Sequence, residues 1–397
     1  MVGTKMIFPE LIINKKNWNH IFHAYNNNKL PHALLFHGPE GVGKEGHAIE
    51  LAAMLNCKNI LDNAACGNCS SCKKTKSFQH ENVKLILPLP RGKIASSNDS
   101  PIKAFKNEKA LQDYQDIINT KASNPYFQMR IQGANTILIN SIREIKKNLS
   151  LSIDNEEWKI ILIFNAEKLC VPSPAAAHAL LKVLEEPPDQ TIIILVTSQH
   201  NIILDTIHSR CQKLYFPSIS NEIIQDRLEK MGQDPVHASI IAHIASGDIS
   251  LSKQLVEDYS ELMEKLYVFL NACFSQDASI WEKCIDISTR LKNKDFFHLE
   301  QLFRLAILFY RDLFYYKSTS LHDGIIFKNH INKIVKLCEK YPEGNWHSCI
   351  QAVEATQNYI LRNGYLPLMM MNLIIDIQQS IQGKHHELFN LSDWIST

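Results

Sequence analysis

Short apolar runs rich in β-branched residues alternate with helical patterns in the first half of the chain. The runs most typical of strands span residues 34–38, 84–88, 159–166, 191–198 and 213–216. Those at 159–166 and 191–198 are almost wholly apolar, as strands are when helices cover both faces of a parallel sheet. The pattern therefore predicts an α/β domain over residues 1–217.

The strand pattern ends after Pro217, and helical periodicity follows to the end of the chain. Residues 218–257 fit a small helical unit with glycines as stop signals. Over residues 258–397 apolar positions recur every three or four residues, which predicts a C-terminal helical bundle. A segment at about 88–133 is rich in Ser, Asn, Pro and Lys, so we expect a variable insertion that is exposed and partly mobile.

Composition and charge exclude few functions. The 397 residues are 45% hydrophobic and 21% charged, which is typical of a globular protein. A net charge of +1 does not indicate a nucleic-acid binder, so any DNA contact would need a local patch or partner subunits. The sequence contains neither an apolar run long enough to cross a bilayer nor a signal-peptide pattern. We expect no membrane association and a cytoplasmic location, consistent with free thiols.

Four cysteines crowd into one short segment: Cys57, Cys66, Cys69 and Cys72. A CxxCxxC run with one more cysteine upstream can supply four thiolates in the tetrahedral arrangement of a structural zinc site. Coincidence, buried free thiols and a redox pair are the alternatives. The intervening residues are glycine, asparagine and serine, which favour turns over core, and we therefore predict zinc. The other six cysteines are predicted to be reduced core thiols.

A glycine-rich loop follows the first predicted strand and precedes a helical pattern. Its sequence places Gly38, Gly41, Gly43 and Lys44 where a phosphate loop needs close backbone approach and a cation at a helix N-terminus. The next residue is Glu45, whereas a working loop has the Ser or Thr that ligates Mg²⁺. A carboxylate at that position also repels a triphosphate.

The end of the strand at 159–164 provides a second test of ATP chemistry. Nucleotide hydrolysis requires a carboxylate for magnesium and usually another to activate water, but the chain has Asn165, Ala166 and then Glu167. Both losses predict that this site does not turn over ATP efficiently. Nucleotide binding through Lys44 and the loop amides stays open as a weaker expectation.

The motifs along the first 217 residues resemble AAA+ clamp-loader subunits, most closely the delta-prime subunits of bacterial DNA polymerase III. The resemblance rests on PHALLFHGPEGVGKEGHAIELAAMLNC (31–57), CGNCSSC (66–72), AAAHALLKVLEEPP (175–188) and LDTIHSRCQKLYF (204–216). It implies an AAA+ domain with a zinc-binding insertion at 57–72, a small helical lid at 218–257 and a collar or oligomerisation bundle at 258–397.

The same resemblance implies roles for single residues. The four clustered cysteines are similar to the family's zinc ligands, and Arg210 in Ser-Arg-Cys is similar to the arginine finger inserted into a neighbour's ATP site. Without the resemblance, Arg210 would be interpreted as a surface arginine. Thr197 lies where active members place a γ-phosphate sensor, and Ser250 stands where they tend to carry a sensing arginine. Glu185 and Glu186 are expected to serve structure and subunit contact, since adjacent helical residues project about 100° apart.

The expected function is a non-hydrolysing stator within the DNA-directed DNA polymerase III holoenzyme. Its implied partners are the gamma/tau and delta subunits, with the sliding clamp and primer-template DNA reached through the assembly. One alternative is an active gamma/tau-like ATPase that uses Lys44. Another is a zinc-dependent nucleic-acid-binding module, which the few aromatic and basic residues around the cysteines disfavour.

Overall fold

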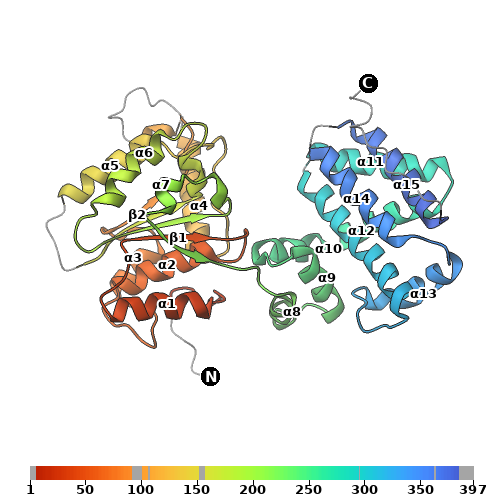
Figure 1. Cartoon of the computed structure of the whole chain (residues 1–397), viewed down its shortest axis with the longest axis horizontal. Coiled ribbons are helices and arrows are strands. Elements are labelled where there is room, and N and C mark those ends of the chain that lie inside the picture. Colours follow the sequence, from red (N-terminus) through yellow and green to blue (C-terminus); the bar gives the residue numbers. More distant parts are fainter. Residues whose placement is uncertain are drawn as a thin grey trace. The chain divides into compact units, whose positions relative to one another are not determined.

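The computed structural model describes residues 6–91, 101–105, 108–151, 157–294, 296–361 and 364–383. The chain divides into two compact units (Figure 1). The first comprises Met1–Ile219 with Asp248–Ser250, and the second comprises Ser220–Gly247 with Leu251–Thr397.

The first unit is built on a five-stranded sheet in the order β2-β3-β4-β1-β5, and every neighbouring pair is parallel. The strands are β1 (Ala33–His37), β2 (Val83–Ile86), β3 (Lys159–Phe164), β4 (Thr191–Thr197) and β5 (Gln212–Tyr215). The predicted parallel α/β fold is confirmed. Each of the five strands ends one or two residues earlier than predicted. For example, β3 stops before Asn165, whose φ of 51° is left-handed and leaves the strand conformation.

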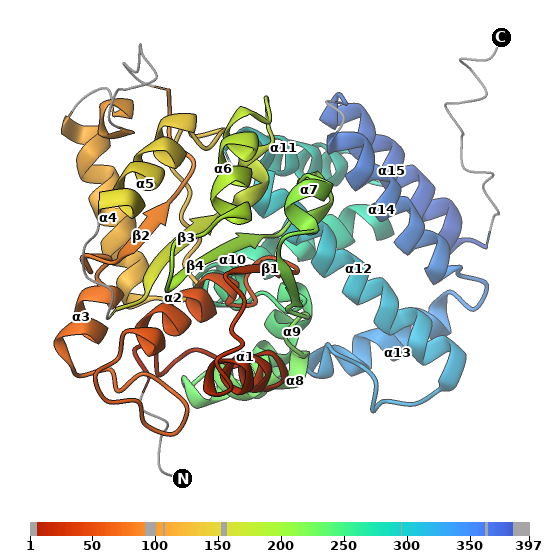
Figure 2. The ribbon, with the colours of Figure 1, turned by 60° about the vertical axis from the view of Figure 1, so that its left-hand side comes forward.

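Helices cover both faces of this sheet. They are α1 (Lys15–Asn26), α2 (Lys44–Leu55), α3 (Ser70–Lys76), α4 (Glu108–Ser123), α5 (Ile139–Leu151), α6 (Ala175–Glu185) and α7 (Asp205–His208), with 3₁₀ turns η1 (Pro101–Ala104), η2 (Ala166–Leu169) and η3 (His200–Ile202). Helices α5 and α6 lie on one face, and α2 lies on the other (Figures 1 and 2). Every residue of β3 and β4 is buried, which explains the unbroken apolar runs.

One apolar cluster fixes α6 and α7 against the sheet. It joins Ile161 and Leu195 from the strands to Leu180 and Leu184 of α6 and to Ile207 of α7, all of them at most 1% exposed. Burying each such side chain contributes about 1.5 to 3 kcal/mol. The two helices therefore form a rigid platform at this face of the sheet.

The segment predicted as an exposed insertion is partly buried. Residues 92–100 and 106–107 lie outside the described part, but α4 is a regular 16-residue helix. Lys121, Tyr126 and Met129 are at most 2% exposed. The prediction is wrong there because the Lys121 ammonium pairs with Glu45 and because apolar side chains of the segment pack around Leu89 and Leu138.

The second unit is helical. Its elements are α8 (Asn221–Lys230), α9 (Pro235–Ala245), α10 (Ile249–Phe274), α11 (Ala278–Lys294), α12 (Phe296–Thr319), η4 (Lys328–His330), α13 (Ile331–Lys340), α14 (Trp346–Leu361) and α15 (Leu366–Ile381). Helix α12 packs against α11, α13 and α14. Helix α10 runs without a break across residues 257 and 258, because it contains no Gly or Pro that would end it. The expected boundary at 257/258 therefore falls inside this helix, and the division into three domains stays a prediction.

A buried carboxylate ties α12 to the segment that precedes η4. Asp312 is fully buried and accepts hydrogen bonds from the backbone N–H groups of Ile326 (2.9 Å) and Phe327 (2.8 Å). Burial raises the pKa of Asp312 to about 6, and Arg311 beside it acts in the opposite direction.

No helix in the described part of the chain is long and apolar enough to cross a membrane.

Candidate functional site

The glycine-rich loop lies at the carboxyl edge of the sheet. Strand β1 ends at His37, which pairs with Thr197 at the end of β4, and β3 ends beside them. Gly43 has a φ of 85° and caps the N-terminus of α2, and a Cβ there would lie 2.9 Å from Leu11 and 3.0 Å from Tyr126. The conformation and the close approach both require glycine. The turn that leads from β1 into α2 therefore depends on glycine at position 43.

The Lys44 ammonium is bound by the loop itself. It donates to the carbonyl oxygens of Gly38 (2.8 Å) and Pro39, and to the hydroxyl of Ser198 (3.1 Å). An ammonium has three N–H donors, so the loop and Ser198, which directly follows β4, already satisfy all of them. The adjoining cavity has a volume of about 50 Å³, far below the roughly 300 to 1,000 Å³ typical of ligand pockets.

Glu45 forms an ion pair with Lys121 of α4. The same ammonium donates to the carbonyl oxygens of Pro125 (2.9 Å) and Phe127 (2.7 Å), and it lies 6.0 Å from the ring centroid of Phe164 at the end of β3. The buried Lys121 ammonium, bound by three oxygens, thus lies between α2 and the end of β3. Working phosphate loops carry a magnesium ligand at the position of Glu45.

Carboxylates surround the Lys44 ammonium. Burial lowers the pKa of Lys44 to about 8, while Glu45, Glu40, Glu167 and Asp248 act in the opposite direction. The Asp248 carboxylate lies against the loop, since a Cβ on Gly41 would be 1.8 Å from its Oδ1. A triphosphate here would meet several negative charges, which oppose its binding.

Glu167, the carboxylate nearest in sequence to the position of a water-activating base, already accepts a hydrogen bond within this chain. Glu167 is buried in η2, and its carboxylate accepts a hydrogen bond from the Thr197 hydroxyl at 2.6 Å. That hydroxyl in turn accepts the backbone N–H of Gln199 at 3.0 Å. Asn165 lines the cavity but Glu167 does not. The carboxylate of Glu167 is therefore hydrogen-bonded to Thr197, the residue expected to sense a γ-phosphate.

Arg210 lies apart from the Lys44 cavity, which it does not line. It follows α7, and its guanidinium donates to Glu185 Oε1 of α6 (2.8 Å), to the carbonyl of Thr206 (2.9 Å) and to the Ser209 hydroxyl (3.2 Å). Its side chain is 34% exposed. The guanidinium is therefore partly exposed to solvent, and it does not contact this chain's own glycine-rich loop in the described conformation.

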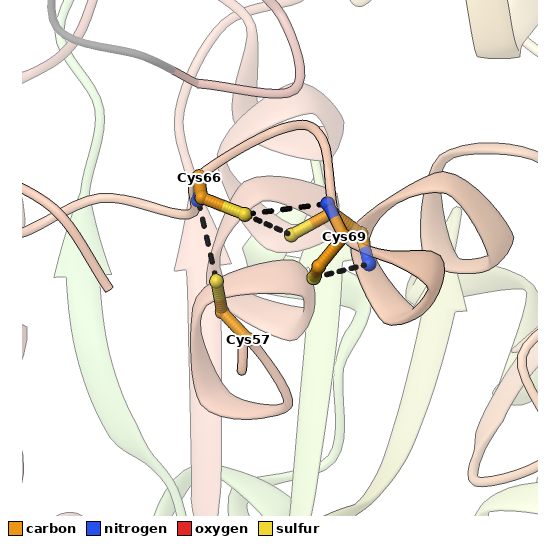
Figure 3. Close-up of side chains that lie close together, drawn as sticks. Cys57, Cys66 and Cys69 are labelled. Carbon is orange, nitrogen blue, oxygen red and sulfur yellow. Dashed lines mark hydrogen bonds between the residues drawn. The ribbon is translucent and has the colours of Figure 1, made fainter. Parts of the chain in front are cut away.

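The structure brings the four predicted cysteines together. The sulfur atoms of Cys57, Cys66, Cys69 and Cys72 all lie within 4.8 Å of one another, and those labelled in Figure 3 converge. The Cys66 and Cys72 sulfurs are 3.9 Å apart. Tetrahedral Zn–S bonds of about 2.3 Å would separate sulfurs by about 3.8 Å. The spacing and the donor set both fit a four-cysteine metal site.

Backbone N–H groups donate hydrogen bonds to three of the four sulfurs. Cys57 Sγ accepts the N–H of Cys66 at 3.3 Å, Cys66 Sγ that of Cys69 at 3.4 Å, and Cys69 Sγ that of Cys72 at 3.4 Å. Burial by itself raises the pKa of Cys69, but the N–H groups of Cys72 and Lys58 bring it down to about 6. All four are free thiols, as metal binding requires.

Two of the side-chain contacts described above cannot be predicted from the sequence. Lys121 stands in a polar segment and gives no sign that its ammonium pairs with Glu45, 76 residues away. The expectation that Glu185 serves structure and subunit contact does not include its bond to Arg210. Neither pair has a regular spacing, so only the fold discloses them.

Comparison with known proteins places the chain in a family. The family model described as "DNA polymerase III, delta subunit" matches residues 13–220, just over half of the chain. DNA polymerase III subunit delta-prime of Bacillus subtilis is 23% identical over 372 residues, which cover 90% of this chain and 94% of that protein. Subunit tau of the same organism is 24% identical, covering 79% of this chain and 51% of tau.

A further relative supports the same assignment. Subunit delta-prime of Escherichia coli is 25% identical over 192 residues, which cover 48% of this chain and 44% of that protein. The resemblance drawn from the sequence motifs is thereby confirmed. The chain belongs to the DNA polymerase III delta subunit family, and delta-prime and gamma/tau subunits are its relatives.

Proposed function

We propose that this chain is a delta-prime-type subunit of the DNA polymerase III clamp loader that does not hydrolyse ATP itself. The observation that carries the proposal is the state of the phosphate loop, whose lysine and glutamate are both bound by groups of this chain. A nucleotide would have to displace those bonds and the surrounding carboxylates. The molecule then acts as a stator in the cytoplasm, holding ATPase subunits in place.

The second element of the proposal is Arg210 as an arginine finger in trans. A guanidinium offered to a neighbour's ATP site stabilises the charge that develops on the transferred phosphoryl group, an effect worth about 10³-fold to 10⁵-fold in rate in GTPases. The exposure of Arg210 and its separation from the Lys44 cavity support this role. The neighbour would be a gamma/tau subunit, a delta subunit would join the same assembly, and the clamp and primer-template DNA would be reached through it.

The third element is a structural zinc ion held by Cys57, Cys66, Cys69 and Cys72. The donor set is closed, with four thiolates and no open coordination position, which suits a structural role over a catalytic one. Cys57 directly follows the end of the loop helix, so bound metal would brace α2 against α3.

Reconstitution tests the proposal. The purified chain is mixed with the gamma/tau and delta subunits of its organism, and ATP turnover is measured for the chain alone and for the assembly on primed DNA. We expect no turnover by the chain alone and DNA-stimulated turnover by an assembly that contains it. Turnover by the chain alone that is lost in Lys44→Ala would instead establish the gamma/tau-like ATPase alternative.

A further inference from the structure

The arginine proposed as a finger is held by a carboxylate from another helix. Two of the Arg210 acceptors, Thr206 O and Ser209 Oγ, belong to its own turn and move with it. The third, Glu185 Oε1 at 2.8 Å, lies 25 residues away at the end of α6. Among the described residues that contact its side chain, only Glu185 ties the guanidinium to a separate element.

The backbone on both sides of the contact between Arg210 and Glu185 is packed into the apolar core of the first unit. Leu184, next to Glu185, and Ile207, three residues before Arg210, are buried in the same apolar cluster. The backbone of α6 therefore cannot follow the arginine when it moves. Releasing the finger toward another subunit requires breaking the bond to Glu185.

The contact has a strength that suits exchange. The side chains of Arg210 and Glu185 are 34% and 49% exposed, and ion pairs of this kind change an equilibrium by about twofold to fivefold. A phosphate group on the neighbour offers more negative charge and bidentate geometry. It can therefore take the guanidinium from the carboxylate, whereas a fully buried pair would hold it.

We propose that Glu185 is a positioning residue that holds Arg210 in a resting geometry, from which ATP bound to the neighbouring subunit must withdraw it. This inference rests on the proposed finger role. Because ATP binding breaks the contact, Glu185 stabilises only the state without bound ATP. Removing it strengthens ground-state and transition-state binding equally, which lowers KM and leaves kcat unchanged.

The test uses the assembled complex on primed DNA with Glu185→Gln, which keeps the shape of the side chain and removes its charge. We expect the KM for ATP to fall about twofold to fivefold, with kcat within about twofold of wild type. Asp189→Asn is the matched control, because its carboxylate is exposed in the turn between α6 and β4 and is not among the residues expected to contact another subunit. It should change neither constant.

Single and double variants of Glu185 and Arg210 decide between the possibilities. An unchanged or raised KM in Glu185→Gln, or a reduced kcat, overturns the resting-contact inference. Arg210→Ala in the same assembly tests the finger separately, since loss of turnover there with no effect of Glu185→Gln removes only the inference. Full turnover by Arg210→Ala removes the finger role itself. In Arg210→Ala, adding Glu185→Gln should have no further effect on either constant.

Discussion

The ion pair between Glu45 and Lys121 gives a direct test of how the segment around α4 is attached to the glycine-rich loop. Glu45→Ala leaves the Lys121 ammonium, which is 1% exposed, without a countercharge, whereas Glu45 itself is 16% exposed. Removing one partner of a buried pair costs about 3 to 5 kcal/mol, because a buried charge is left uncompensated. We expect a cost near the lower end, since the carbonyls of Pro125 and Phe127 still accept from the ammonium.

Removing both charges should restore part of this loss. In Glu45→Ala/Lys121→Met no buried charge is left, so we expect the double variant to be at least about 1 kcal/mol more stable than Glu45→Ala. The matched control is Glu40→Ala, which breaks the pair that the same loop makes with Arg130. Both of those side chains are exposed, so the cost should stay below about 1 kcal/mol.

Hydrogen exchange of the intact chain, resolved to the peptides that cover α4, measures the free energy of local opening. A loss of about 3 kcal/mol accelerates exchange by at least about 100-fold. Exchange in Glu45→Ala within fivefold of wild type would refute the idea that this pair attaches the segment to the loop. A double variant less stable than Glu45→Ala would show that the pair is not the source of the cost.

Three further outcomes follow from the structure. Cys69→Ser should lower the zinc content of the purified chain from one ion to near zero and loosen α3, which elemental analysis and hydrogen exchange measure; equal metal in both proteins would contradict the four-cysteine site. Burial lowers the pKa of His47 to about 4, so the unfolded chain takes up a proton that the folded chain refuses, and the free energy of unfolding should fall by about 3 kcal/mol between pH 6.5 and 4. His47→Gln should lose that part of the pH dependence in denaturant titrations, and identical pH profiles would contradict it. Asp312→Ala leaves the buried N–H groups of two residues without an acceptor and should cost about 2 to 5 kcal/mol in the same titrations, while a change below about 1 kcal/mol would exclude the anchoring role.

The apolar and cysteine patterns predicted the structure where the physical signal is local. The unbroken apolar runs of β3 and β4 predicted strands buried on both faces, and all of their residues are buried. The CxxCxxC spacing predicted four converging sulfurs, because a short turn-rich loop offers few other arrangements. The odd residue at the loop, Glu45, indicated a defect without showing its partner.

The polar contacts that define the site could not be read from spacing. The pairs of Glu45 with Lys121 and of Glu185 with Arg210 join residues 76 and 25 positions apart, and both depend on where the sheet brings helices together. A lysine in a polar segment is usually solvated, and nothing in the sequence indicates that Lys121 is buried. Apolar periodicity reports burial of hydrophobic faces and gives no signal for a buried ammonium such as that of Lys121.

ATP turnover by the assembled complex on primed DNA, compared between Lys44→Ala and Arg210→Ala of this chain, tests most directly whether it acts on a neighbour's nucleotide and not on its own. We expect Lys44→Ala to keep turnover within about twofold of wild type, because that ammonium binds its own loop, and Arg210→Ala to lose at least about 10³-fold at the site it serves. The opposite pattern, with turnover lost in Lys44→Ala and kept in Arg210→Ala, would show that the chain is itself the motor.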